Sequence, residues 1–215
     1  MLKKIFPLLP ALLLLSFAMT ARAETGAGPD DLSEVLSLLS RNSLQVKTLS
    51  CGFTQEKHLE ILDEALTSTG SFSFQRPDCL RWEIVEPVSS GIIVNGEDGG
   101  TWHGRTGESE HFKVKDVQAV RILSQQLFAF ATMDFDALKD QFRIDLVQKE
   151  PAVILLTPHV VEMQDYIKSL RITLAPGGQY VETVRMNESD GDYTMLHFRD
   201  VEINTPLGKD LFKLP

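Results

Sequence analysis

The sequence is poor in the residues that build metal centres and disulfide frameworks. Its 215 residues include two cysteines and five histidines, and the histidines stand singly along the chain. A zinc site needs three or four such ligands at close spacing, so no metal site is predicted. Cys51 and Cys79 form an even pair that could make one disulfide in an oxidising compartment. Their number and spacing leave the bridged and the free state both open.

The sequence also lacks the common motifs of enzyme chemistry. It contains no Gly-x-Ser-x-Gly nucleophile elbow, no glycine-rich phosphate loop ahead of a helix and no His-Glu-x-x-His pair. Neighbouring carboxylates such as Asp134 and Asp136 fit the start of a helix, where negative charge is favourable. We therefore expect that the protein is not an enzyme and that it uses no cofactor.

Basic residues are few compared with acidic ones. The chain has 21 Lys and Arg against 30 Asp and Glu. Without Lys3, Lys4 and Arg22, which lie in the leader described next, 18 basic residues remain and the net charge is −12. Binding to nucleic acid and adsorption to anionic lipid both depend on clustered Lys and Arg. The charge balance argues against both and favours an ordinary solvated surface.

A long apolar run occurs at the N-terminus. Two lysines precede an apolar segment from about Ile5 to Met19, and Ala21-Arg22-Ala23 has the small-x-small form that signal peptidase cleaves. We expect residues 1–23 to be a cleaved signal peptide and residues 24–215 to be one exported, soluble domain. A single membrane helix is the competing interpretation, which the shortness of the run and its two prolines weaken.

The stretch from Gly70 to Pro87 reads GSFSFQRPDCLRWEIVEP and predicts two amphipathic strands. Phenylalanines alternate with serines in its first half, and Leu80, Trp82 and Ile84 alternate with charged residues in its second half. Counting back in twos from Trp82 leads to Arg76, so this side chain is expected to point toward the apolar face. A guanidinium in that position needs a polar partner.

Further strands are predicted along most of the chain, with helices at two places. One helix is expected from about residue 29 to residue 41 or 42, and two short helices between residues 117 and 138 with a break at 132–134. The expected strands cover residues 49–57, 68–75, 79–85, 91–95, 100–104, 109–114, 142–146, 152–156, 167–174, 180–186, 193–198 and 201–204. We expect a mainly β fold with some α, in which these strands form a single curved antiparallel sheet, an unclosed half β-barrel around an apolar interior.

The mid-chain helical segment is strongly apolar at Leu127-Phe128-Ala129-Phe130. These side chains could cover a cavity, or they could plug the open end of the core. The second alternative is the more common in general. The aromatic residues Phe72, Phe74 and Trp82 also fit a core as readily as a ligand site.

Several landmarks occur in a fixed order along the mature chain. They are Phe53-Thr54-Gln55 with Lys57, Gly70-x-Phe72-x-Phe74-x-Arg76-Pro77-x-x-Leu80-Arg81-Trp82 followed by Pro87, Val94-Asn95-Gly96 with Trp102, Leu156-Thr157-Pro158, and Phe212-x-x-Pro215. In this order and spacing the chain resembles the LolA-like periplasmic lipoprotein carriers of Gram-negative bacteria.

The resemblance implies a fold and a site. The fold would be an unclosed antiparallel barrel with an N-terminal helix and a mid-chain helical lid over a hydrophobic cavity for acyl chains. Arg76 occupies the position of an arginine that holds the lid closed through hydrogen bonds to the lid backbone. The candidate cavity residues are Phe53, Phe72, Phe74, Leu80, Trp82, Ile84, Leu127, Phe128 and Phe130.

The resemblance also implies partners and a location. The protein would work as a monomer in the periplasm of a Gram-negative bacterium. It would take acylated lipoproteins or lipids from an inner-membrane ABC-type exporter and pass them to an outer-membrane receptor. His103 and Gly104 depart from the bulkier pair expected after Trp102, and the cysteines are not obvious family features. A paralogue that carries another lipid, or a lipoprotein-sensing interaction module, would keep the same landmarks.

Overall fold

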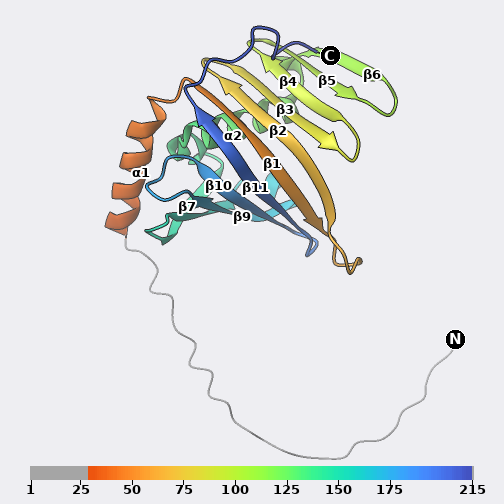
Figure 1. Ribbon diagram of the computed structural model, residues 1–215. Helices are drawn as coiled ribbons and strands as arrows, with labels where there is room; N and C mark the ends of the chain where they lie inside the picture. Colours follow the sequence, from red (N-terminus) through yellow and green to blue (C-terminus); the bar gives the residue numbers. More distant parts are fainter. Residues whose placement is uncertain (1–28, 215) are drawn as a thin grey trace, which may run out of the picture.

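The computed structural model describes residues 29–214, in which eleven strands form one antiparallel sheet (Figure 1). The strands are β1 Thr48–His58, β2 Leu66–Gln75, β3 Cys79–Glu86, β4 Ser90–Asn95, β5 Asp98–His103, β6 Glu108–Lys113, β7 Phe142–Gln148, β8 Val153–Pro158, β9 Ile167–Leu174, β10 Val181–Glu188 and β11 Tyr193–Ile203. Their spatial order is β6-β5-β4-β3-β2-β1-β11-β10-β9-β8-β7. Because β6 and β7 lie at opposite edges, the sheet is not closed, which confirms the predicted half-barrel.

Five helical segments accompany the sheet in the described residues. They are α1 Pro29–Ser43, η1 Val114–Asp116, α2 Gln118–Thr132, η2 Phe135–Leu138 and α3 Val161–Gln164. The predicted break in the mid-chain segment is confirmed, since Met133 adopts a left-handed conformation with φ 58° between α2 and η2. The short α3 was not expected. No helix among residues 29–214 is long and apolar enough to cross a membrane.

Strand alternation places apolar side chains on the inner face of the sheet, where they form two clusters. One cluster joins β7 to β10 with α1, α2 and η2, and its fully buried members include Leu39, Phe135 and Ile172. The other joins β1 to β4 with α2, and Phe53 and Leu80 lie at its centre. Leu196 and Phe198 of β11 pack against both clusters, so the inner face is apolar across the whole sheet.

Gly70 of β2 makes room for the most buried aromatic residue of β1. Gly70 pairs with Phe53, and a Cβ at position 70 would collide with the Phe53 ring and with the Glu83 carbonyl. Any other residue here would push β1, β2 and β3 apart. The glycine at the start of the GSFSF segment is therefore required by packing.

The two short strands expected at 193–198 and 201–204 are in fact one strand, β11. Asp200 interrupts the alternation because it takes a left-handed conformation with φ 53°, and the register with β1 shifts between Ser50 and Gly52. This is the geometry of a β-bulge, in which one extra residue breaks the period of two without ending the strand. The interruption in the pattern was mistaken for a strand end.

A C-terminal segment covers part of the outer face of the sheet. Phe212 is buried in a third cluster with Ile93 of β4 and Trp102 of β5. Arg81 fastens the segment, since one of its terminal nitrogens donates to the carbonyl oxygens of Leu211 at 3.2 Å and Lys213 at 3.3 Å, while the guanidinium lies 4.6 Å from the centre of the Trp102 ring.

Cys51 and Cys79 are free, so of the two states that the sequence left open this structure has the unbridged one. Cys51 is buried in the inner cluster of β1 to β4, whereas Cys79 packs against the outer cluster. Strand β2 separates β1 from β3, and the two thiols lie on opposite faces of the sheet. Bridged cysteines need Cα atoms within about 7 Å and Cβ atoms that point toward each other, which this arrangement does not provide.

The expected signal peptide, residues 1–23, lies outside the described residues. The same holds for the start of the mature chain up to residue 28. Both stay predictions from the sequence.

Candidate functional site

Helix α2 lies across the inner face of the sheet, behind the strands in Figure 1. Its side chains reach both inner clusters: Val120, Leu127 and Phe128 pack toward β1 to β4, while Ala129 and Phe130 pack toward β7 to β10. The helix therefore covers the middle of the half-barrel, where the sequence expected a lid.

A cavity of about 210 Å³ separates α2 from the sheet. None of its twelve lining residues is charged, and Gln126 and Thr194 are its polar members. The lining consists of Trp82, Leu123, Gln126, Leu127, Phe130, Ile167, Leu170, Val184, Met186, Thr194, Leu196 and Phe198. A surface of this kind binds apolar groups and offers almost nothing to a polar head group. We refer to this space as the apolar cavity.

Aromatic rings form one wall of the apolar cavity. The Trp82 ring stacks on Phe53 with centroids 4.3 Å apart, meets Phe72 at 5.8 Å and meets the edge of Phe198 at 6.4 Å. Phe53 is fully buried behind Trp82, so it supports the wall and leaves Trp82 in a fixed position. Such aromatic pairs contribute about 0.5–1.5 kcal/mol beyond the area they bury.

A second, smaller space of about 30 Å³ continues the apolar wall under α2. It shares Trp82, Leu127, Phe130 and Phe198 with the apolar cavity. Drug-sized ligands occupy pockets of roughly 300–1,000 Å³, so both spaces are small for a long alkyl chain. The structure is thus a closed form, in which the α2 side chains fill much of the space between helix and sheet.

The C-terminal end of α2 is firmly attached. The Met133 amide donates to the Phe130 carbonyl at 3.3 Å and the Asp134 amide to the Ala129 carbonyl at 2.9 Å, which caps the last turn. The Met133 side chain is 1% exposed and packs into the core. At the N-terminal end of α2, Val117 makes no side-chain cap hydrogen bond, so this end is held less tightly.

The structure places four of the nine candidate cavity residues at the surface of these two spaces. Phe72, Trp82, Leu127 and Phe130 line them. The others lie beside or behind this surface: Phe53, Leu80 and Ile84 belong to the core cluster, while Phe74 and Phe128 line a different pocket described below. Contact of any of these residues with an acyl chain stays a prediction.

Most of the remaining lining residues come from β9, β10 and β11 and were not among the candidates. The sequence showed the signal, because Val184 and Met186, and likewise Leu196 and Phe198, alternate with polar residues. The candidates were taken from the landmark strands and the lid, and the pairing of Phe53 with Phe198 across β1 and β11 is a long-range contact that alternation does not reveal.

Arg76 is exposed at the β2–β3 turn, and its hydrogen bonds go to the end of α1 and the loop that follows it. Its Nε donates to the Val46 carbonyl at 2.8 Å and its Nη2 to the Ser43 carbonyl at 3.0 Å. Within residues 29–214, no hydrogen bond joins Arg76 to α2 or η2. In the closed form Arg76 therefore caps the C-terminus of α1, where a cation is favourable. A lock on the mid-chain lid stays a prediction.

A mixed pocket of about 410 Å³ lies between α2, η2 and the Arg76 turn. The aromatic pair Phe74 and Phe128, in edge contact at 5.6 Å, lines its apolar side. Its polar side includes Asp134, Asp140 and the side chain of Gln141, whose Oε1 atom has no hydrogen-bond partner among residues 29–214. Through this pocket Arg76 lies beside α2 without bonding to it.

Cys51 lines the smaller space under α2, and its thiol has low reactivity in the closed form. Burial raises the pKa of the Cys51 thiol to about 12, although a hydrogen bond with the Phe72 backbone acts to lower this pKa. The thiol stays neutral at physiological pH and behaves as a small apolar group.

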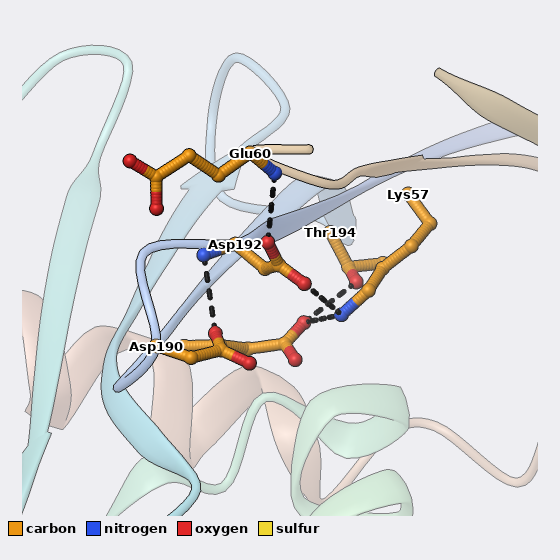
Figure 2. Close-up of polar contacts among 6 residues, drawn as sticks. Lys57, Glu60, Asp190, Asp192 and Thr194 are labelled. Carbon is orange, nitrogen blue, oxygen red and sulfur yellow. Dashed lines mark hydrogen bonds and ion pairs between the residues drawn. The ribbon is translucent and has the colours of Figure 1, made fainter. Parts of the chain in front are cut away.

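One group of carboxylates in the described residues has the spacing of a metal site. The ligand atoms of Glu188, Asp190 and Asp192, at the β10–β11 turn, lie within 4.8 Å of one another. The Lys57 ammonium is paired with Glu188 and lies 3.9 Å from Asp192. Figure 2 shows Lys57 pointing toward Asp192. The lysine supplies the positive charge that a metal ion would bring, so the group does not indicate a metal centre.

Known structures with a similar arrangement of strands and helices agree with this fold. The solved structure of an uncharacterized conserved protein from Thermus thermophilus has a TM-score of 0.52 at 7% identity, covering 86% of this chain and 93% of that one. The crystal structure of lipoprotein LppX from Mycobacterium tuberculosis has a TM-score of 0.50 at 9% identity, covering 85% and 99%. At these identities the likeness shows the fold alone.

Similarity in sequence goes further. An outer-membrane lipoprotein carrier protein of Pseudoalteromonas translucida (strain TAC 125) is 22% identical over 171 residues, which cover 78% of this chain and 76% of that protein. The model of the family described as outer membrane lipoprotein carrier protein LolA matches residues 44–215, well over half of the chain. The chain therefore belongs to the LolA family of outer-membrane lipoprotein carrier proteins.

Proposed function

We propose that this protein is a periplasmic carrier that binds the acyl chains of lipoproteins beneath α2. It would receive them from an inner-membrane ABC-type exporter and deliver them to an outer-membrane receptor. The observation that supports this most is the apolar cavity between α2 and the sheet, whose lining contains no charged residue. Membership of the LolA family supports carriage, because the family is one of carriers.

The size of the hydrophobic effect explains why such cargo needs a carrier. Each buried methylene is worth about 0.8 kcal/mol, so an acyl chain of about 16 carbons has about 13 kcal/mol of transfer free energy. Without a carrier, the acyl chain would have to pass from the membrane into water, and it would not do so at a useful rate. A cavity lined by Trp82, Leu196 and Phe198 offers it an apolar environment.

A carrier must also release its cargo, and the closed form supplies a reason why it can. Leu127 and Phe130 of α2 occupy the space beneath the helix, so cargo has to displace these side chains before it can bind. The free energy of those self-contacts is subtracted from the gain of acyl burial. Binding is then strong enough to extract a lipid anchor and weak enough to pass it on.

The same cavity would serve a paralogue that carries a different acylated lipid or that senses misplaced lipoproteins. Its lining recognises alkyl chains and carries no charged group that would select a head group or a peptide. The identity of the cargo therefore has to come from transfer experiments with defined lipoproteins and lipids.

The test is release and delivery of an acylated lipoprotein. Inner-membrane vesicles with an energised exporter are incubated with the mature protein, and the released lipoprotein is then offered to outer-membrane vesicles. We expect wild type to release and deliver cargo, and Leu127→Glu to release almost none, because a carboxylate in the cavity disfavours the acyl chain.

Arg121→Glu is the matched control, since Arg121 is an exposed residue of the same helix and does not line the cavity. It should release cargo as wild type does. Release by Leu127→Glu at the wild-type level would contradict binding beneath α2. Failure of wild type with lipoprotein, together with extraction of another lipid, would favour the paralogue.

A further inference from the structure

Two strand connections are joined at one end of the half-barrel. The β1–β2 loop is fastened to the β10–β11 turn because the Glu60 amide donates to the Asp192 carboxylate at 2.9 Å (Figure 2). The Ser189 amide in turn donates to the Tyr166 carbonyl at 3.2 Å. We call residues 59–66 and 188–192, together with Tyr166, the rim.

The rim lies next to the apolar cavity. Thr194 lines the cavity, and its hydroxyl donates to the Glu188 carboxylate of the rim at 3.1 Å. Met186, also in the cavity lining, pairs with Thr194 across β10 and β11. A molecule seated on the rim would therefore be close to any acyl chain that enters beneath α2.

Large apolar side chains on the rim are unusually exposed. Ile61 is 89% exposed and Tyr166 is 74% exposed, and Leu62 and Leu66 are also exposed. Single exposed apolar residues are ordinary, but several gathered on joined loops are typical of an interaction surface. No contact within residues 29–214 buries the Ile61 side chain.

A groove of about 360 Å³ lies beside these residues. It is lined by His58, Leu59, Glu60, Leu62, Gly191 and Tyr193. The rings of His58 and Tyr193 stack with centroids 4.2 Å apart, which makes a rigid wall. The groove has room for an apolar side chain of a partner, and Glu60 is one of its lining residues.

The charge of the rim is strongly negative. Six carboxylates belong to it: Glu60, Asp63, Glu64, Glu188, Asp190 and Asp192. The neighbouring ammonium group of Lys57 is already paired with Glu188 and Asp192. Glu60, Asp63, Glu64 and Asp190 have no basic partner in the part of the chain that the structure describes. The surplus charge repels anionic lipid and attracts a cationic surface.

We propose that the rim is a docking surface for a partner protein that places an apolar side chain in the groove and arginine or lysine side chains against its carboxylates. The negative charge of the rim favours a cationic partner protein over an anionic membrane surface. Because the rim lies beside Thr194 of the apolar cavity, a protein docked there is close to the cargo. The proposal deepens the proposed function and rests on it in one respect, namely that the docked protein gives or takes the cargo.

The test measures binding of the mature protein to membranes by co-sedimentation. The probes are right-side-out inner-membrane vesicles and outer-membrane vesicles, each untreated or pretreated with protease, and liposomes of phosphatidylethanolamine and phosphatidylglycerol. We expect saturable binding to at least one untreated membrane, loss of binding after protease treatment, and weakening as sodium chloride is added.

Two variants address the rim. Ile61→Ser should bind about tenfold more weakly, which is about 1.4 kcal/mol, and the double variant Glu60→Gln with Glu64→Gln should lose most of its salt dependence. The control is Leu44→Ser, since Leu44 is 72% exposed but lies between α1 and β1, away from the rim. It should bind as wild type does, and equal unfolding midpoints would show that all three variants are folded.

Four outcomes would overturn the proposal: no saturable binding by wild type, equal binding by Ile61→Ser and wild type, equal binding to protease-treated membranes, or equal binding to the liposomes. The last two would assign the rim to lipid. A fluorescent fatty-acid titration of the same proteins separates this proposal from the proposed function. If wild type does not bind the fatty acid, the proposed acyl carrier is refuted, but binding of the rim to a membrane protein is not.

Discussion

Phe130 of α2 offers the sharpest test of the idea that the closed form competes with its own cargo. Its ring lines both spaces beneath the helix and lies 6.4 Å from the Phe135 ring. Phe130→Ala removes that ring and leaves the sheet wall untouched. The variant therefore enlarges the space for a ligand and lowers the cost of displacing α2.

The magnitude follows from burial. Full burial of a phenylalanine side chain is worth roughly 1.5–3 kcal/mol, and Phe130 is only partly buried in the closed form. We expect the closed form to lose about 1.4 kcal/mol of helix-to-sheet contact, which corresponds to about tenfold tighter binding of an alkyl ligand. The free energy of unfolding should fall by a similar amount.

The assay is a titration with a fluorescent fatty acid, with unfolding in urea as the measure of stability. Phe142→Ala is the control, because Phe142 of β7 is 1% exposed but does not line the apolar cavity. This change should cost about 3–5 kcal/mol of stability and leave fatty-acid affinity unchanged. Weaker or unchanged binding by Phe130→Ala would refute self-competition, because the lost contacts between ring and ligand would then match or outweigh the space gained.

Three further predictions address other parts of the structure. Arg76→Leu removes two hydrogen bonds to the end of α1 and the loop after it, so the free energy of unfolding should fall by about 1–3 kcal/mol. Onward delivery of cargo should also slow, and Arg105→Leu, a change at another exposed arginine, is the control. Normal delivery to purified acceptor would argue against a lock. Gly70→Val should prevent stable folding, because its Cβ would collide with Phe53, and a thermal unfolding midpoint near that of wild type would count against the required glycine. The pKa of Cys51 is raised to about 12, so the folded state keeps a proton that the unfolded chain releases above about pH 9; its contribution to stability is full below pH 9 and is lost as the pH rises toward 12. Cys51→Ala should flatten that loss in unfolding measurements across this range, and identical slopes would show that the thiol is not protected.

Local patterns were enough to predict the architecture of the sheet and the place of the lid. The alternation of Leu80, Trp82 and Ile84 predicted which side chains face inward. The same parity predicted an inward Arg76, but this residue is exposed and bonds to the Ser43 and Val46 carbonyls. The helical period and the polar break before η2 predicted two mid-chain helices. Each of these signals depends on residues only a few positions apart, which is why it can be read from the chain.

Contacts between segments that are distant in the sequence could not be predicted from the alternation of apolar and polar residues. The pairing of β1 with β11 brings Phe198 to the wall built by Phe53 and Trp82, and it depends on the closure of the whole sheet order. The partners that Arg76 has in the closed form were not identified for the same reason, since the end of α1 and the lid offer equally polar acceptors in sequence. The bulge at Asp200 changed a local period, and only the register with β1 identifies it.

The cysteines show how parity and strand order act together. Cys51 shares the inward parity of Phe53, whereas Cys79 precedes the inward Leu80 and so points outward. That assignment becomes decisive only when β2 is known to lie between the two strands. The union of the loop around Ile61 with the β10–β11 turn likewise depends on the strand order and does not show in the sequence pattern.

The most direct test of the central claim is photo-crosslinking with a lipoprotein whose acyl chain carries a diazirine. After release from inner-membrane vesicles, the complex is irradiated and the labelled residues are identified by mass spectrometry. We expect labels on the residues that line the space beneath α2, above all Trp82, Leu127, Phe130 and Phe198. Labels confined to the outer face around Trp102 and Phe212, or no label on a carrier that still delivers cargo, would contradict acyl binding in the apolar cavity.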